Sequence, residues 1–241
     1  MSAIDDAVAR LRLCAKPVLF ETGIKDTPYG GVGTSFLVRQ GPHVFLVTAR
    51  HVVEGATLDQ LLVFANEETD ESVPFSEAFS VANRDPDDPD FSDIVLVRVH
   101  LPNLRLADGS KMHTIDLDKA SDSWRKAPFG QRFVLFGYPN ESREIDYEGG
   151  RIISTQRFLV ARFSGVSPTS YCYELEIEDF NGTDDLNGLS GSPVLSWPRV
   201  IGDNFHPSFC GMVLRGTKES GKVHFLDAGL LRKAIEIAGD N

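Results

Sequence analysis

The sequence predicts an all-β protein with a helix at each end, and three patterns along its 241 residues lead to this prediction. Between residues 17 and 138, short apolar runs alternate with turns rich in Gly, Pro and Asp, as in β-barrels. Residues 156–163 and 171–177 alternate polar and apolar side chains, which is typical of half-buried strands. Apolar residues recur at helical spacing in residues 3–14 and 227–238, so we expect an amphipathic helix in each range.

The predicted organisation is two packed β-units between these helices. A chain of this length can bury one large or two small cores, and two six-stranded barrels would fill it. The polar stretch 106–124 is the predicted junction, because its Asp, Lys and Ser content suits an exposed crossing. The chain then divides into an N-terminal helical segment (1–16), a first barrel (17–115), a second barrel (116–226) and a C-terminal helix (227–241).

The composition limits the partners of the protein. A formal net charge of -11 argues against general binding to nucleic acid or to an anionic membrane. The sequence has no run of about 20 apolar residues, the length needed to span a bilayer. Acids stand near the N-terminus, where a signal peptide needs positive charge. Cys14, Cys172 and Cys210 are few, odd in number and widely spaced, so we expect free thiols. These features predict a cytoplasmic protein.

Two segments place a histidine and an aspartate at the ends of predicted strands. His51 follows the β-branched and aromatic run 44–48, and Asp93 opens the apolar run 94–97 after the acidic loop 85–90. Catalytic side chains often lie in such loops beside a rigid scaffold. A carboxylate orients an imidazole, which can then take a proton from a hydroxyl. His51 and Asp93 are therefore candidates for an acid–base pair.

A third segment supplies the hydroxyl. Residues 188–193 read G-L-S-G-S-P and place Ser190 between Gly188 and Gly191. Small neighbours let the backbone turn tightly and aim amide groups at one point, which suits an oxyanion hole. A serine hydroxyl is a poor nucleophile until a neutral imidazole takes its proton. The three segments together predict a Ser-His-Asp site.

These segments resemble those of the trypsin-like (chymotrypsin-fold) serine proteases, which carry T-A-A-H, D-[IL]-A-L and G-x-S-G-[GS]-P in the same order. Segments 33–38 (G-T-S-F-L-V), 135–139 (L-F-G-Y-P) and 209–213 (F-C-G-M-V) are also similar to patterns of that family. The resemblance extends from about residue 17 to the C-terminus. It implies a fold of two six-stranded antiparallel β-barrels of the chymotrypsin type.

The resemblance also implies a role for each residue. His51 would be the general base and then the general acid, Asp93 would hold its tautomer, and Ser190 would attack the carbonyl. The amides of Gly188 and Ser190 would stabilise the oxyanion, by about 3 to 4 kcal/mol per donor. The implied activity is that of an endopeptidase, which cuts protein or peptide substrates through an acyl-enzyme and needs neither a cofactor nor a metal.

Three positions depart from the family pattern, and of these Arg50, where an alanine is usual, is read as surface variation. Leu189 stands before the nucleophile, where proteases made as zymogens have an aspartate that pairs with a newly cut N-terminal amine. This favours the bacterial-type branch, in which the site assembles without such cleavage. Leu214 replaces a serine that in many relatives hydrogen-bonds the triad aspartate, so the support of Asp93 is left open.

The substrate-binding residues also follow from the resemblance. Asp184 lies six residues before Ser190, at the position of the base of the primary specificity pocket, where an acid favours Arg or Lys before the scissile bond. Asp184 could instead cap a solvated loop. Leu214, Arg215 and Gly216 lie on the strand expected to flank the cleft. Arg215 could neutralise Asp184, and the pocket would then accept small or apolar residues.

Other kinds of site are disfavoured. The remaining histidines are scattered without the spacing of metal ligands. The acidic loop 85–90 lacks the alternating ligands and the glycine of a calcium-binding loop. The glycines around Ser190 do not match an α/β-hydrolase elbow, and the chain lacks alternating strands and long helices. Two alternative functions stay open: a protease-like binding module, and a latent protease that an activating partner switches on, as in a bacterial stress or defence system.

Overall fold

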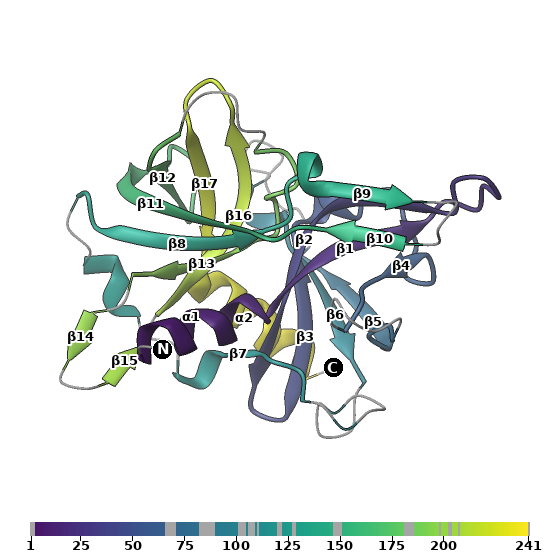
Figure 1. Cartoon of the computed structure of the whole chain (residues 1–241). Coiled ribbons are helices and arrows are strands. Elements are labelled where there is room, and N and C mark those ends of the chain that lie inside the picture. The colour runs from purple at the N-terminus through teal and green to yellow at the C-terminus, as the bar shows by residue number, and fades with distance from the viewer. Residues whose placement is uncertain are drawn as a thin grey trace.

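The computed structural model is mostly β, with helix α1 near the N-terminus and helix α2 at the C-terminal end (Figure 1). The structure describes residues 3–65, 71–81, 90–100, 105, 109, 111–119, 122–126, 129–146, 151–180, 186–197, 199–201, 204–206 and 208–240.

The elements have the following bounds. The α-helices are α1 (Ala3–Arg12) and α2 (Ala228–Gly239), and the 3-10 helices are η1 (Arg50–Val52), η2 (Asp90–Ser92), η4 (Leu117–Lys119), η5 (Asp122–Lys126) and η6 (Asn140–Ser142). The strands are β1 (Ala15–Glu21), β2 (Tyr29–Gln40), β3 (His43–Thr48), β4 (Leu61–Leu62), β5 (Phe75–Ser80), β6 (Val95–Val99), β7 (Ile115–Asp116), β8 (Arg132–Gly137), β9 (Arg143–Asp146), β10 (Arg151–Ser154), β11 (Arg157–Val166), β12 (Cys172–Ile177), β13 (Pro193–Ser196), β14 (Arg199–Ile201), β15 (Asn204–His206), β16 (Phe209–Thr217) and β17 (Lys222–Asp227).

The first half of the chain forms a sheet with the strand order β4-β1-β2-β3-β6-β5. Its central strand β3 is buried on both faces: Phe45 and Val47 enter one apolar cluster, while Val44 and Leu46 enter another. The pairs along this order are antiparallel, and β7 adds to β2 in parallel. The sheet thus has seven strands where six were predicted. The additional strand is β7, whose Ile115 belongs to the same apolar cluster as Phe45 and Val47.

The second half closes into a barrel with the order β11-β12-β17-β16-β13-β8, as Figure 1 shows at its upper left. The neighbouring strands in this order pair antiparallel, in agreement with the predicted barrel. Its interior is apolar and includes Phe133, Leu175, Val213 and Phe225, each fully buried. Exclusion of this surface from water is the main force that closes the barrel.

A shared core joins the two halves. Phe36 of β2 and Phe209 of β16 pack with their rings 5.4 Å apart, and Leu231 and Ile235 of α2 belong to the same cluster. The side chain of Asp227 accepts a hydrogen bond from the Gly229 N–H and so caps the start of α2. Because one core contains residues from both halves and from α2, the halves are held in a defined relative position.

The three cysteines are free and buried. Burial raises the pKa of the Cys14 thiol to about 12 and also raises that of Cys210, so these two thiols stay protonated and unreactive at neutral pH. Neither of the two helices in the described part of the chain is long and apolar enough to cross a membrane.

Candidate active site

His51 lies in η1, where the chain turns directly after β3. Its backbone N–H donates to Asp93 Oδ1 at 3.0 Å, and its ring Nδ1 lies 2.7 Å from Asp93 Oδ2. An ionised carboxylate only accepts, so we assign the ring hydrogen to Nδ1, which leaves Nε2 as an acceptor. The predicted acid–base pair therefore meets in space, with the ring in the tautomer that a general base requires.

The surroundings strengthen His51 as a base. Its pKa is raised above the ordinary value of 6.5, first by the hydrogen bond to Asp93, whereas partial burial acts in the opposite direction. The negative charges of Asp93 and Glu54 raise this pKa further, and the positive charge of Arg215 lowers it. The His51 side chain is 46% exposed and that of Asp93 is 19% exposed, so the imidazole is open to solvent while its partner is largely covered.

Ser190 lies in the turn before β13, and its Oγ donates to the Leu214 carbonyl oxygen at 2.7 Å. Leu214 is the extra residue where the register between β16 and β17 shifts, so the ladder leaves its carbonyl free to turn outward. No hydrogen bond links Ser190 to His51 among the described residues. The nucleophile candidate is thus held by β16 rather than by the imidazole.

The turn before β13 leaves two backbone amides available. The Asn187 carbonyl accepts from the Asn140 N–H at 2.9 Å, and the Leu189 carbonyl accepts from the Ser192 N–H at 2.9 Å. In a trans peptide the N–H points away from the C=O of the same unit, so the N–H groups of Gly188 and Ser190 point away from these contacts. Neither N–H donates to an acceptor in the described part of the chain. Gly188 has φ +90°, a conformation that favours glycine.

Strand β2 holds this turn through Thr34, a buried residue to which the sequence reasoning assigned no role. Thr34 Oγ1 donates to the Gly188 carbonyl at 2.7 Å and accepts from the Tyr138 N–H at 2.9 Å. The Thr34 N–H donates to the Ser190 carbonyl at 3.0 Å. The first half of the chain therefore positions the turn of the second half. Thr34 belongs to the segment 33–38 that resembles the protease family, which is the signal that could have drawn attention to it.

A glycine on β2 allows the two candidate segments to approach. A side chain at Gly33 would overlap the Val52 side chain next to His51, and its Cβ would lie 3.3 Å from the Ser190 carbonyl oxygen. A residue without a side chain is therefore needed where η1 and the Ser190 turn converge on the strand.

Of the four residues predicted to bind substrate, the structure describes three, and each has different surroundings. The Leu214 side chain is buried, and the contact with Ser190 is made by the backbone carbonyl. Arg215 is exposed and forms an ion pair with Asp90, so the positive charge that could have neutralised Asp184 has another partner. Gly216 is partly exposed, and an added Cβ there would lie 3.0 Å from Val223. Asp184 itself lies outside the described residues.

Sequence reasoning did not single out Asp90 from the acidic run that precedes Asp93. A run of six residues with four acids looks like a solvated loop, and nothing in its sequence marks the last acid as buried. Asp90 begins η2, and its carbonyl accepts from the Asp93 N–H at 3.1 Å. The other residues of this run, 85–89, lie outside the described residues.

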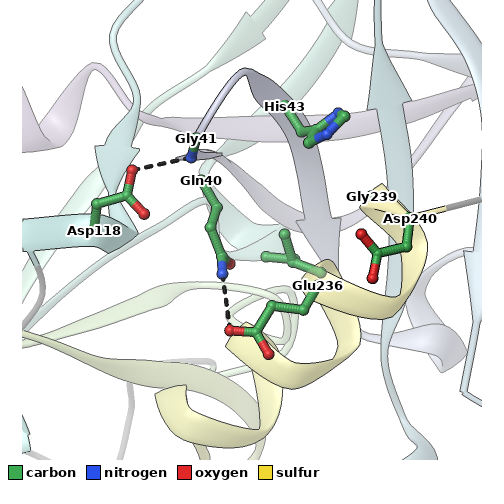
Figure 2. A pocket seen from close by; sticks show the side chains of 8 residues that line it. Gln40, Gly41, His43, Asp118, Glu236, Gly239 and Asp240 are labelled. Atoms are coloured by element: carbon green, nitrogen blue, oxygen red, sulfur yellow. Dashed lines mark hydrogen bonds between the residues drawn. The ribbon is translucent and has the colours of Figure 1, made fainter.

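A hollow of about 420 Å³ lies elsewhere, between the β2–β3 turn and the C-terminal end of α2 (Figure 2). Its lining consists of Gln40, Gly41, His43, Asp118, Ile235, Glu236, Gly239 and Asp240. Asp118 accepts from the Gly41 N–H at 2.9 Å, and Gln40 Nε2 donates to Glu236 at 3.2 Å. The lining contains no residue of the candidate active site. In the described ranges, no group of three His, Cys, Asp or Glu side chains could hold a metal ion.

Comparison with known proteins agrees with this architecture. No family model and no curated protein matches the sequence. Among solved structures, the human heparin binding protein matches with a TM-score of 0.63 and 15% sequence identity, over 96% of this chain and 93% of that chain. The chain has the chymotrypsin fold. At this identity the likeness concerns the fold, and the function must be argued from the site.

Proposed function

We propose that this chymotrypsin-fold protein is a serine endopeptidase of the bacterial-type branch, with Ser190, His51 and Asp93 as its catalytic triad. The observation that carries the proposal is the 2.7 Å contact between His51 Nδ1 and Asp93, which leaves Nε2 as a base. The turn with Ser190 and two available amides supplies the other parts of an acyl-transfer site.

In the proposed reaction, the Ser190 hydroxyl leaves the Leu214 carbonyl, transfers its proton to His51 Nε2 and attacks the substrate carbonyl. Asp93 stabilises the imidazolium that forms. The Gly188 and Ser190 amides hold the tetrahedral oxyanion. His51 then protonates the leaving amine, and water hydrolyses the acyl-enzyme with the same imidazole as base. No step uses a metal or an organic cofactor.

The surroundings of Leu189 support the assignment to the bacterial-type branch. Its side chain is 1% exposed and packs in the same apolar cluster as Leu186 and Val213. A newly formed N-terminal amine has no carboxylate to pair with at this position. We propose that the site assembles without N-terminal cleavage, in a cytoplasmic protein whose partners are protein or peptide substrates.

A second function is favoured by one specific observation, the hydrogen bond of Ser190 to Leu214 instead of His51. A nucleophile held in this way suits a latent protease that an activating partner releases. It also suits a protease-like binding module, and the structural neighbour is named for binding heparin. The net charge of -11 makes an anionic polysaccharide an unfavourable ligand for this chain.

Labelling with a fluorophosphonate probe separates these functions, because the probe reacts only with an activated serine. The wild-type chain should be labelled without any partner. Ser190→Ala should not be labelled, and its kcat on a cleaved peptide should fall by roughly 10⁶-fold. Ser192→Ala is the matched control, since Ser192 lies two residues further on and is fully buried. It should retain labelling.

The other outcomes decide between the alternatives. Labelling that requires a cell extract would indicate a partner-activated protease. A wild-type chain that is never labelled would indicate a binding module, and hydrolysis that persists in Ser190→Ala would exclude this serine as the nucleophile.

A further inference from the structure

An exposed arginine lies beside the candidate active site. Arg215 directly follows Leu214, whose carbonyl oxygen is 2.7 Å from Ser190 Oγ. Its side chain is 45% exposed, although the six residues before it in β16 are all buried. Its positive charge lowers the pKa of His51, and its own pKa is raised first by the hydrogen bond to Asp90 and also by the charge of Asp93. Arg215 is therefore an exposed cation that directly follows the residue in contact with Ser190 and pairs with the segment that carries Asp93.

The carboxylate that pairs with this arginine is buried. The Asp90 side chain is 9% exposed, and its Oδ1 accepts from Arg215 Nη1. Its Oδ2 is fully buried and has no hydrogen-bond partner. Asp90 is fixed beside the acid–base pair, because its carbonyl accepts from the Asp93 N–H. The ion pair thus joins the segment that carries Asp93 to the strand that contacts Ser190.

The unequal burial of the two partners decides which charge a ligand can reach. A cation cannot approach Asp90, since its free oxygen has no accessible surface. An anion can approach Arg215, whose guanidinium has five N–H donors and binds Asp90 through one nitrogen. A carboxylate that accepts two of the remaining donors would match the planar fork of the guanidinium.

The other charged neighbours do not occupy this position. His224 lies opposite Arg215 on β17, and burial, followed by the charge of Arg215, lowers its pKa. Its Nδ1 is 3.2 Å from Ser167 Oγ and 3.9 Å from Glu174. Glu174 in turn accepts from Lys222 at 3.2 Å. Among the described residues, Asp90 is the one acid that contacts the guanidinium.

We infer that Arg215 determines specificity by binding an acidic side chain of the substrate close to the scissile bond, with Asp90 holding the guanidinium in position. This inference rests on the proposed protease function. It adds an acidic substrate residue to the basic residue that the family resemblance would assign to Asp184. A substrate that satisfies both would carry an acid and a base near the same bond.

The experiment measures kcat/KM on a peptide series derived from one cleaved sequence. In each peptide one position, from four residues before the scissile bond to two after it, carries either Glu or its neutral counterpart Gln. At one position the wild-type chain should prefer Glu by about tenfold, the effect of a charge-assisted hydrogen bond. Arg215→Gln should reduce this ratio to about one, and Arg215→Lys should retain part of it, because charge persists without the planar fork.

Two further variants keep the test decisive. Arg215→Gln leaves Asp90 buried without its partner, so the double variant Arg215→Gln/Asp90→Asn provides a neutral pair and should also show no preference. Asp90→Asn alone should retain the preference, because the guanidinium keeps its charge and the Asn side-chain oxygen can still accept its hydrogen bond. Arg162→Gln is the matched control: Arg162 is 53% exposed and pairs with Glu178 on the same barrel. It should leave the ratio unchanged.

The outcomes distinguish this inference from the proposed function. If the probe labels Ser190 and peptides are cut, but Glu and Gln are cut equally at every position, the inference is wrong and the protease function stands. A preference for Glu that survives in Arg215→Gln also overturns it. If the wild-type chain neither reacts with the probe nor cuts any peptide, with or without cell extract, the proposed function fails and the inference fails with it.

Discussion

The two halves of the molecule present their parts of the candidate active site in different states. In the first half, His51 and Asp93 lie 42 positions apart in the chain and are already joined by two hydrogen bonds. In the second half, Ser190 donates its hydroxyl to the Leu214 carbonyl of its own barrel. The acid–base pair is complete within one half, whereas the nucleophile must leave one partner before it can reach the other.

This difference shows what each half depends on. The His51–Asp93 pair needs only the ends of β3 and β6 in one sheet. The Ser190 turn needs the other half, because Thr34 of β2 contacts it through both its hydroxyl and its backbone N–H. Relative movement of the halves would therefore disturb the nucleophile and the amides before it disturbed the acid–base pair. A partner that acts on the packing of the halves would act on the Ser190 turn.

Among the changes that test this difference between the halves, removal of the charge of Asp93 should have the largest effect on kcat. In Asp93→Asn the amide would donate to Nδ1, which moves the ring hydrogen to Nε2 and removes the base. We expect kcat to fall by about 10⁴-fold. Asp118→Asn is the control, because Asp118 accepts a hydrogen bond in the remote hollow and should not affect kcat. A loss below tenfold in Asp93→Asn would contradict the role of this carboxylate.

A second change tests whether the first half holds the turn of the second. Thr34→Val retains the shape of a buried side chain but leaves the Gly188 carbonyl and the Tyr138 N–H without their partner. Each unsatisfied group should cost about 1 to 3 kcal/mol in the free energy of unfolding. Displacement of the amides should lower kcat by about 10- to 100-fold. Urea unfolding and steady-state kinetics measure the two effects.

The neighbouring residue provides the control for this prediction. Ser35 is also fully buried on β2, but its Oγ donates to the Lys16 carbonyl at 3.2 Å, and among the described residues no hydrogen bond joins this side chain to the Ser190 turn. Ser35→Ala should reduce stability without reducing kcat. Equal losses of kcat in Thr34→Val and Ser35→Ala would show that stability alone, and not the position of the turn, governs activity.

The smallest expected effect concerns the pH dependence. His51 must be neutral to act as a base, so kcat/KM should rise with pH through its pKa, which lies above the ordinary 6.5. Glu54→Gln removes a charge that raises this pKa and should move the rise to lower pH. Arg215→Gln removes a charge that lowers it and should move the rise to higher pH. The rate of probe labelling against pH measures both shifts, and shifts in the same direction would contradict the assignment.

The same pKa sets the sign of the contribution of His51 to stability. Because the pKa is higher in the folded than in the unfolded chain, protonated His51 stabilises the fold. This contribution is complete below about pH 6.5 and disappears as the pH rises through the folded pKa. It opposes the gain in activity over the same range.

The sequence alone was sufficient for the strands, for the chymotrypsin fold through the resemblance of its motifs to a protease family, and for the choice of His51, Asp93 and Ser190 as candidates. Strand periodicity is local, and the three motifs combine a functional residue with the strand or glycines that position it. The helix at the C-terminus was predictable for the same reason: apolar residues recur on one face from Leu230 onward, and α2 spans Ala228–Gly239.

Tertiary structure decided the contacts that join distant segments. Thr34 and Gly188 are 154 positions apart and Asp90 and Arg215 are 125 apart, so no local pattern could pair them. The partner of Ser190 depends on a register shift in β16 that presents the Leu214 carbonyl, and the seventh strand of the first sheet depends on a parallel pairing of only two residues. Residue types determine which chemistry a side chain can perform. Which partner it meets is decided by packing, because burial and register are properties of the whole fold.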